Sequence, residues 1–190
     1  MPASLVRRHP TRRFRLTTGH KGRDYLPSSL GVGLILIVAA IVAARADDGS
    51  AEATAPAPLT EYKGRTIAPT MTYHGADWLT RKEREQEEHC KTLLKALNIK
   101  PGQAVCDMGC GNGFYTLRLA KLVGKQGRVL AVDVQPEMLH LLDLRAKQSR
   151  FENIEPIQGT LTDPKLPEGE VDLILLVDVY HEFSHPEQML

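Results

Sequence analysis

Cysteine is scarce in this chain, and neither sign of charge is in excess. The three cysteines among 190 residues, Cys90, Cys106 and Cys110, are too few for a disulfide framework. Three residues separate Cys106 from Cys110, where a common zinc knuckle has two. Basic and acidic residues number 24 and 23, so no basic surface accompanies the fold. We therefore expect no metal site and no nucleic-acid partner.

Long apolar runs are missing as well. The longest uncharged apolar run, residues 30–44, is shorter than the roughly 20 residues that span a bilayer comfortably. A group of arginines precedes it, and Ala44-Arg45-Ala46 follows it in the small-any-small pattern of a signal-peptidase site. We predict a signal peptide over residues 1–46. The alternative is a membrane anchor formed by residues 27–46, so the predicted location is either exported (periplasmic or extracellular) or membrane-anchored.

The segment after the apolar run has the composition of a linker. Residues 47–60 contain few large apolar side chains and are rich in alanine and proline, which leaves no core to bury. The length suits one globular domain plus an extension. We predict that the folded domain occupies residues 61–190.

Apolar patterns in this domain alternate between strand and helix. A capping box at Thr80 and Glu83 predicts a helix that ends before Pro101, and helical spacing recurs over residues 114–122 and 136–146. Apolar β-rich runs precede or follow these helices at residues 105–107, 128–134, 153–158 and 171–179. Pro156 favours an edge position for the third run. The pattern predicts an α/β, Rossmann-like, doubly wound and mostly parallel sheet.

The first strand ends in an acidic residue and a loop with glycine at every second position. The order is D-x-G-x-G-x-G, with Asp107 followed by Gly109, Gly111 and Gly113. Alternating glycines let a backbone turn sharply and leave room for a ligand against the main chain. A dinucleotide fingerprint requires a third glycine where Phe114 stands. The Asp107 carboxylate also suits an ammonium or a sulfonium better than a phosphate, which favours S-adenosylmethionine.

The sequence VCDMGCGNGFYTLRLA resembles the first motif of class I S-adenosylmethionine-dependent methyltransferases. Residues 128–134 (RVLAVDV) resemble the second motif, whose acidic residue, here Asp133, binds both ribose hydroxyls in that family. The resemblance implies S-adenosylmethionine as cofactor and methyl transfer to a small-molecule acceptor. The predicted cofactor-binding residues are Asp107, Gly109, Cys110, Gly111, Gly113, Asp133, Val134, Thr160, Asp163 and Asp178.

Two regions of the chain determine how far the resemblance extends. The family places an aspartate directly after the glycine of the third strand, but here Gly159 is followed by Thr160. Asp163, or the backbone near Thr160, is the expected substitute. At the end of the fourth strand His181 is the predicted general base, because a histidine titrates near neutral pH, and Asp178 is predicted to orient the acceptor. No Asn-Pro-Pro-Tyr signature of amino-methylating enzymes follows that strand.

The resemblance leaves three alternatives open. Family members continue through further strands after Leu190, so we expect a chain truncated at its C-terminus, with the edge of the fourth strand exposed. Such a chain could bind S-adenosylmethionine without turnover, and a dinucleotide-dependent oxidoreductase is a second rival. Trp78 is expected either to cover the cofactor as part of a lid or to fix the following helix to the core.

Overall fold

The structure is a computed structural model that describes residues 4–7 and 56–190. Apart from residues 4–7, the predicted signal peptide or anchor lies outside the described residues, as does most of the predicted linker. Within the described part of the chain, no helix is long and apolar enough to cross a membrane.

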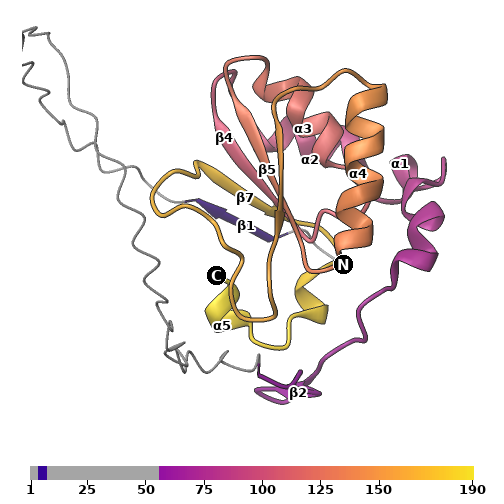
Figure 1. The fold of residues 1–190 in the computed structure, drawn as a ribbon, viewed down its shortest axis with the longest axis vertical. Helices are drawn as coiled ribbons and strands as arrows, with labels where there is room; N and C mark the ends of the chain where they lie inside the picture. Colours follow the sequence, from indigo (N-terminus) through magenta and orange to yellow (C-terminus); the bar gives the residue numbers. More distant parts are fainter. Residues whose placement is uncertain (1–3, 8–55) are drawn as a thin grey trace, which may run out of the picture. The chain divides into compact units, whose positions relative to one another are not determined.

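A five-stranded sheet forms the centre of the domain (Figure 1). Its order is β1-β7-β4-β5-β6, and the strands comprise Ser4–Arg7 (β1), Leu173–Leu176 (β7), Ala104–Met108 (β4), Arg128–Asp133 (β5) and Ile154–Gln158 (β6). The four strands β7, β4, β5 and β6 are parallel to one another, and β1 pairs antiparallel with β7. The predicted α/β fold with a mostly parallel sheet is confirmed.

Helices precede β4, connect β4 to β5 and β5 to β6, and follow β7. The helical elements are η1 (Tyr73–Thr80), α1 (Arg84–Glu87), α2 (Cys90–Leu97), α3 (Thr116–Val123), α4 (Pro136–Gln148), η2 (Tyr180–Glu182) and α5 (Pro186–Met189). A short hairpin of β2 (Glu61–Tyr62) and β3 (Arg65–Thr66) precedes them. Pro136 occupies the first turn of α4, where its missing N–H needs no partner.

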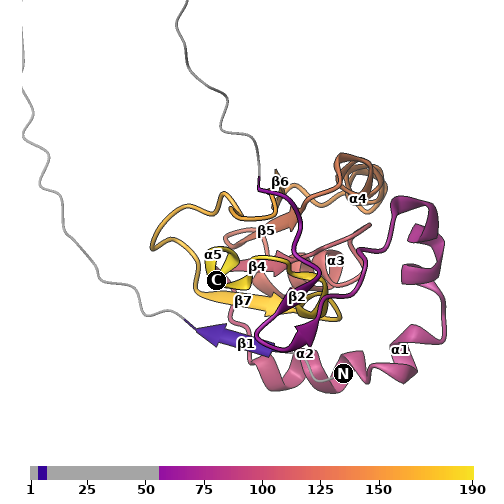
Figure 2. The same ribbon diagram turned by 90° about the horizontal axis from the view of Figure 1, so that it is seen from below.

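Strand alternation divides the core between the two faces of the sheet. Val105, Val129 and Leu173 point to the face covered by α2 and α3, and α4 lies on the same side (Figure 2). Cys106, Leu130 and Ile174 point to the opposite face, where Met189 of α5 packs. Both faces of the central strands are therefore buried, as their continuous apolar sequences predict.

One edge of the sheet is the predicted strand, and the other edge is not. Strand β6 lies at one edge, as Pro156 predicts, and pairs with β5 on its other side. The opposite edge was expected to be the exposed fourth strand. Instead β1 hydrogen-bonds along β7, with Ser4 opposite Leu176 and Arg7 opposite Leu173. An extended segment satisfies the open N–H and C=O groups of an edge whatever its distance along the chain, so local patterns do not reveal this pairing.

The single helix predicted from Thr80 to Pro101 is also wrong. The chain forms η1, α1 and α2 as separate pieces, and His89 between α1 and α2 adopts φ +48°. Thr80 does not cap a helix, because its hydroxyl donates to the Asp77 carbonyl at 3.2 Å. Cys90 and Leu97 of α2 still face the core, as their spacing predicts.

Candidate functional site

A cavity of about 310 Å³ lies at the carboxyl ends of β4, β5 and β7. Open α/β sheets bind ligands at this end of their parallel strands. The cavity is lined by residues from the glycine loop, from the ends of β5 and β7, and from the segment before β4. Eight of the predicted cofactor-binding residues line it: Asp107, Gly109, Cys110, Gly111, Asp133, Val134, Thr160 and Asp178.

The glycine loop is fastened to the neighbouring strand β5 by main-chain hydrogen bonds. The amides of Gly109 and Cys110 both donate to the Val132 carbonyl, at 2.8 and 2.9 Å. The Gly111 amide donates to Oδ2 of Asp133 at 2.8 Å. These bonds fix the loop in place beside the cavity.

Gly109 cannot be replaced without strain in this loop. Its φ is +71°, a conformation that L side chains rarely adopt. A Cβ at this position would lie 2.2 Å from Cγ2 of Val179, three residues after β7 ends. Glycine therefore lets the loop approach the segment after β7 closely. Gly113, by contrast, does not line the cavity and lies against Leu142 of α4.

Asp107 is the most deeply buried acid of the site, with 4% of its surface exposed. Its Oδ2 accepts a hydrogen bond from the Thr116 hydroxyl at 2.6 Å. Burial raises the pKa of Asp107 to about 6, although the Thr116 hydrogen bond and the positive charge of Arg84 oppose the shift. A carboxylate held in this way gains much from a cation brought to it.

Asp133 has a second role that the sequence analysis missed. Its Oδ2 accepts from Gly111, and its Oδ1 accepts from the Gln135 amide at 2.9 Å. Burial raises the pKa of Asp133, and these backbone hydrogen bonds oppose the shift. A carboxylate offers about four acceptor positions, so ribose hydroxyls could still be bound. Asp133 thus joins the glycine loop to the end of β5.

The loop after β6 places the two candidates for adenine binding in different positions. Thr160 lines the cavity, and its hydroxyl accepts the Asp163 amide at 2.9 Å. Asp163 does not line it. Its Oδ1 instead accepts the Lys165 amide at 2.7 Å, within a turn. The geometry therefore favours Thr160 and its backbone over the Asp163 side chain.

The rim after β7 brings together acidic and imidazole groups. Asp178, His181 and Glu182 all line the cavity, and Asp178 has φ +52°. Nε2 of His181 lies 3.9 Å from Oε1 of Glu182. Burial raises the pKa of Glu182 to about 7, against hydrogen bonds from the Met71 backbone and the Thr70 side chain. Glu182 therefore titrates near neutral pH beside the predicted base His181.

Three further residues contribute to the site and carry no motif in the sequence. Gln135 accepts the Tyr73 amide at 3.0 Å and donates to the Met71 carbonyl at 2.8 Å, which holds the segment before β4 over the rim. Asn112, buried, donates to the Ala76 carbonyl at 2.7 Å. Trp78 lines the cavity with 56% of its surface exposed, so it does not fix a helix to the core.

Comparison with known proteins identifies the class. Residues 105–190 match the family model described as a methyltransferase domain. The solved structure of a SAM-dependent methyltransferase from Aquifex aeolicus is similar at a TM-score of 0.60 and 30% identity, over 63% of each chain. Demethylmenaquinone methyltransferases from Geobacillus stearothermophilus and Staphylococcus carnosus are 26% and 29% identical over 45% of this chain. The chain spans 37% and 35% of the length of these two relatives.

Fold and site together define an α/β domain with a ligand cavity at the ends of its parallel strands, built on a glycine loop and two acids. The matched family and the similar structure both identify this arrangement as that of a methyltransferase. Residues 105–190 form a methyltransferase domain of the class I S-adenosylmethionine-dependent type, as the two motifs predict.

Proposed function

We propose that this domain binds S-adenosylmethionine in the described cavity and transfers its methyl group to a small-molecule acceptor. The observation that carries the proposal is the position of Asp107 and Asp133. They end two adjacent parallel strands, both are buried, and the glycine loop lies between them against the cavity. The family and the Aquifex aeolicus structure support the same activity.

The residues present fit this cofactor. Gly109 and Gly111 line the cavity and carry no side chains, so a ligand can approach the main chain of the loop closely. Asp107 would attract the positive groups of the methionine moiety, and Asp133 would accept the ribose hydroxyls. When bound, the cofactor supplies an electrophilic methyl group on a sulfonium. The protein then has to position an acceptor about 3 Å away and, where the acceptor carries a proton, remove it.

The lining of the cavity favours a small apolar acceptor. Apolar side chains line it from several segments, among them Met71, Leu161, Phe183 and Met189. The relatives from Geobacillus stearothermophilus and Staphylococcus carnosus are named for demethylmenaquinone. We propose an acceptor of this apolar, aromatic kind, with Glu182 or His181 as the group that removes its proton.

Titration calorimetry with S-adenosylhomocysteine tests the binding step, and transfer of labelled methyl to demethylmenaquinone tests the reaction. We expect saturable heat, a raised melting temperature and no comparable response to NAD. Binding without transfer to any acceptor would support a non-catalytic binding protein. An absence of heat and of melting shift with a folded sample would refute the proposal.

Glu182→Gln is expected to slow methyl transfer about 100-fold with an acceptor that must lose a proton, because general-base catalysis typically contributes about 10²- to 10⁴-fold. Since the pKa of Glu182 is about 7, the wild-type rate should rise as the pH passes through 7 and the carboxylate ionises. The rate is measured from pH 5.5 to 8.5, together with the affinity for S-adenosylhomocysteine.

The matched control is His181→Asn, which removes the neighbouring candidate base. Affinity for S-adenosylhomocysteine should change less than about threefold in both variants, because neither change removes a carboxylate near the glycine loop. If the rise in rate near pH 7 persists in Glu182→Gln and is absent from His181→Asn, the base is His181.

We also propose, from the sequence pattern alone, that residues 1–46 direct export or anchoring. N-terminal sequencing of the protein from its native host should find Asp47 first if cleavage follows Ala46. An uncleaved chain should sediment with membranes through residues 27–46. Recovery of the uncleaved chain free of membranes would count against both forms of the proposal.

A further inference from the structure

Arg84 is the only lysine or arginine among the described residues that line the cavity. It begins α1 and is 6% exposed, so its charge is almost completely removed from bulk water. A buried charge needs partners that compensate for its lost hydration. The contacts of Arg84 therefore show which of its hydrogen-bond donors already have partners within the protein.

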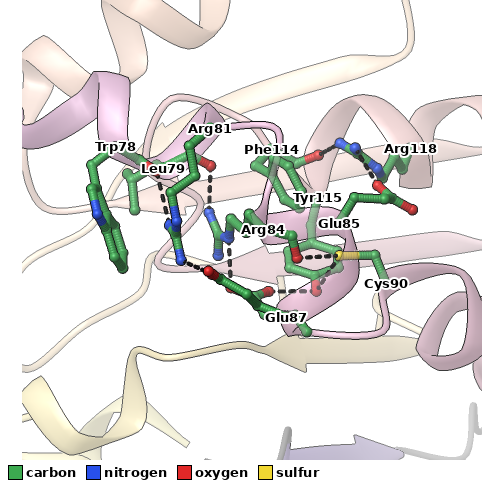
Figure 3. A network of polar contacts seen from close by, with 11 residues as sticks. Trp78, Leu79, Arg81, Arg84, Glu85, Glu87, Cys90, Phe114, Tyr115 and Arg118 are labelled. Atoms are coloured by element: carbon green, nitrogen blue, oxygen red, sulfur yellow. Dashed lines mark hydrogen bonds and ion pairs between the residues drawn. The ribbon is translucent and has the colours of Figure 1, made fainter.

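Part of the guanidinium is held by the segment around α1 (Figure 3). Nε donates to Oε1 of Glu88 at 2.6 Å, and Nη1 donates to the Leu79 carbonyl at 2.8 Å. The guanidinium also lies over the Phe114 ring, 4.4 Å from its centroid, at the end of the glycine loop. Within the described part of the chain, Nη2 has no hydrogen-bond partner. A fixed guanidinium that lines the cavity thus keeps one nitrogen, Nη2, without an acceptor among the described residues.

The charges around Arg84 indicate the kind of ligand that Nη2 would bind. Five carboxyl groups line the cavity, those of Glu88, Asp107, Asp133, Asp178 and Glu182, against this one guanidinium. Asp107 lies near enough to Arg84 for the guanidinium to stabilise its ionised form. A ligand that carries an ammonium and a carboxylate on one carbon matches this adjacent pair of opposite charges.

We propose that Arg84 binds the α-carboxylate of the methionine moiety, while Asp107 attracts its α-ammonium. This inference rests on the proposed function, because it assigns one more contact to the same ligand. Arginine suits the role, since Nε and Nη1 can hold Glu88 and the Leu79 carbonyl while Nη2 donates to a ligand, and the group stays charged at every physiological pH. Phe114 and Glu88 fix the orientation of the guanidinium before the ligand arrives, which lowers the entropy lost on binding.

The experiment compares S-adenosylhomocysteine with 5′-methylthioadenosine, which lacks the amino-acid group, on wild type and Arg84→Gln. We expect the substitution to weaken S-adenosylhomocysteine about 10- to 100-fold, as for loss of a charged hydrogen bond. The affinity for 5′-methylthioadenosine should stay within about threefold. Arg84→Lys should lie between, because it keeps the charge and loses the planar guanidinium.

The matched control is Arg118→Gln. Arg118 also lies over Phe114, 3.9 Å from the ring centroid, but it does not line the cavity. It should leave the preference for S-adenosylhomocysteine unchanged. Equal weakening of both ligands in Arg84→Gln would mean that Arg84 only supports the fold, and would overturn the inference.

Wild type alone provides a second test if Arg84→Gln does not fold. Decarboxylated S-adenosylhomocysteine keeps the ammonium and lacks the carboxylate, so it should bind about 10- to 100-fold more weakly than the intact compound. Equal affinity for the two would overturn the role of Arg84 and leave the proposed function standing. A wild type that binds none of the three ligands would overturn both.

Discussion

Asp107→Asn is expected to weaken S-adenosylhomocysteine about 100-fold and, in the same protein, to stabilise the ligand-free domain. The loss of affinity follows because the ligand's positive group would meet a neutral amide in place of a buried carboxylate. The gain in stability follows because the wild-type carboxylate ionises where water is largely excluded. This one substitution therefore shows that the ionised carboxylate of Asp107 favours ligand binding and disfavours folding.

The direction of the stability effect follows from the pKa of Asp107, which burial raises from 3.8 to about 6 in the folded domain. A raised pKa means that the folded state holds this proton more tightly than the unfolded state. The stabilisation from Asp107 is complete below pH 3.8 and is lost as the pH rises through about 6. Two pKa units correspond to about 3 kcal/mol, which is the largest difference expected between variant and wild type.

Urea unfolding at pH 3.5 and at pH 8, without ligand, measures this effect. The free energies of unfolding of Asp107→Asn and wild type should be close at pH 3.5, and the variant should be the more stable at pH 8. Asp143→Asn is the matched control, because Asp143 pairs with Lys147 on the surface of α4. It should change the free energy of unfolding by less than about 0.5 kcal/mol. A variant less stable than wild type at pH 8 would mean that the Thr116 hydrogen bond outweighs the burial.

The parts of the site that could be predicted from sequence are those with local signals. The order of carboxylate and glycines at the end of β4 and the acid at the end of β5 both identify a strand end, and parallel strands bring such ends together. The edge position of β6 followed from the geometry of Pro156 in the same way. In each case the chemistry of one or two residues restricts the local backbone.

The remaining features depend on contacts between distant segments. The charged sequence around Arg84 predicts a surface residue. In the structure its guanidinium bonds to the Leu79 carbonyl and lies over the Phe114 ring, and the residue lines the cavity. The break at His89 separates α1 from α2, although the sequence there carries no proline or glycine. Tertiary packing overrides local helix propensity at such positions. A short stretch of sequence therefore does not predict these contacts.

Gly113→Ala is the second large effect, and we expect it to destabilise the domain by about 2–4 kcal/mol. Gly113 has φ +87°, and a Cβ there would lie 2.3 Å from Cδ1 of Leu142. Leu142 is completely buried in α4, so it cannot move aside without opening the core. The glycine therefore serves the packing of α4 against the loop, in addition to the turn itself.

Gly102→Ala separates these two contributions, because Gly102 has φ +88° and no atom within 4 Å of a Cβ built there. It should show only the cost of the backbone conformation, about 1–2 kcal/mol. The excess in Gly113→Ala then measures the clash, and Leu142→Ala should cost less in the Gly113→Ala background than in wild type, since the smaller side chain leaves room for the new methyl group. Urea unfolding of wild type, the three single variants and the double variant gives each value. Equal destabilisation by the two glycine substitutions, with no coupling to Leu142, would show that only the turn requires glycine at position 113.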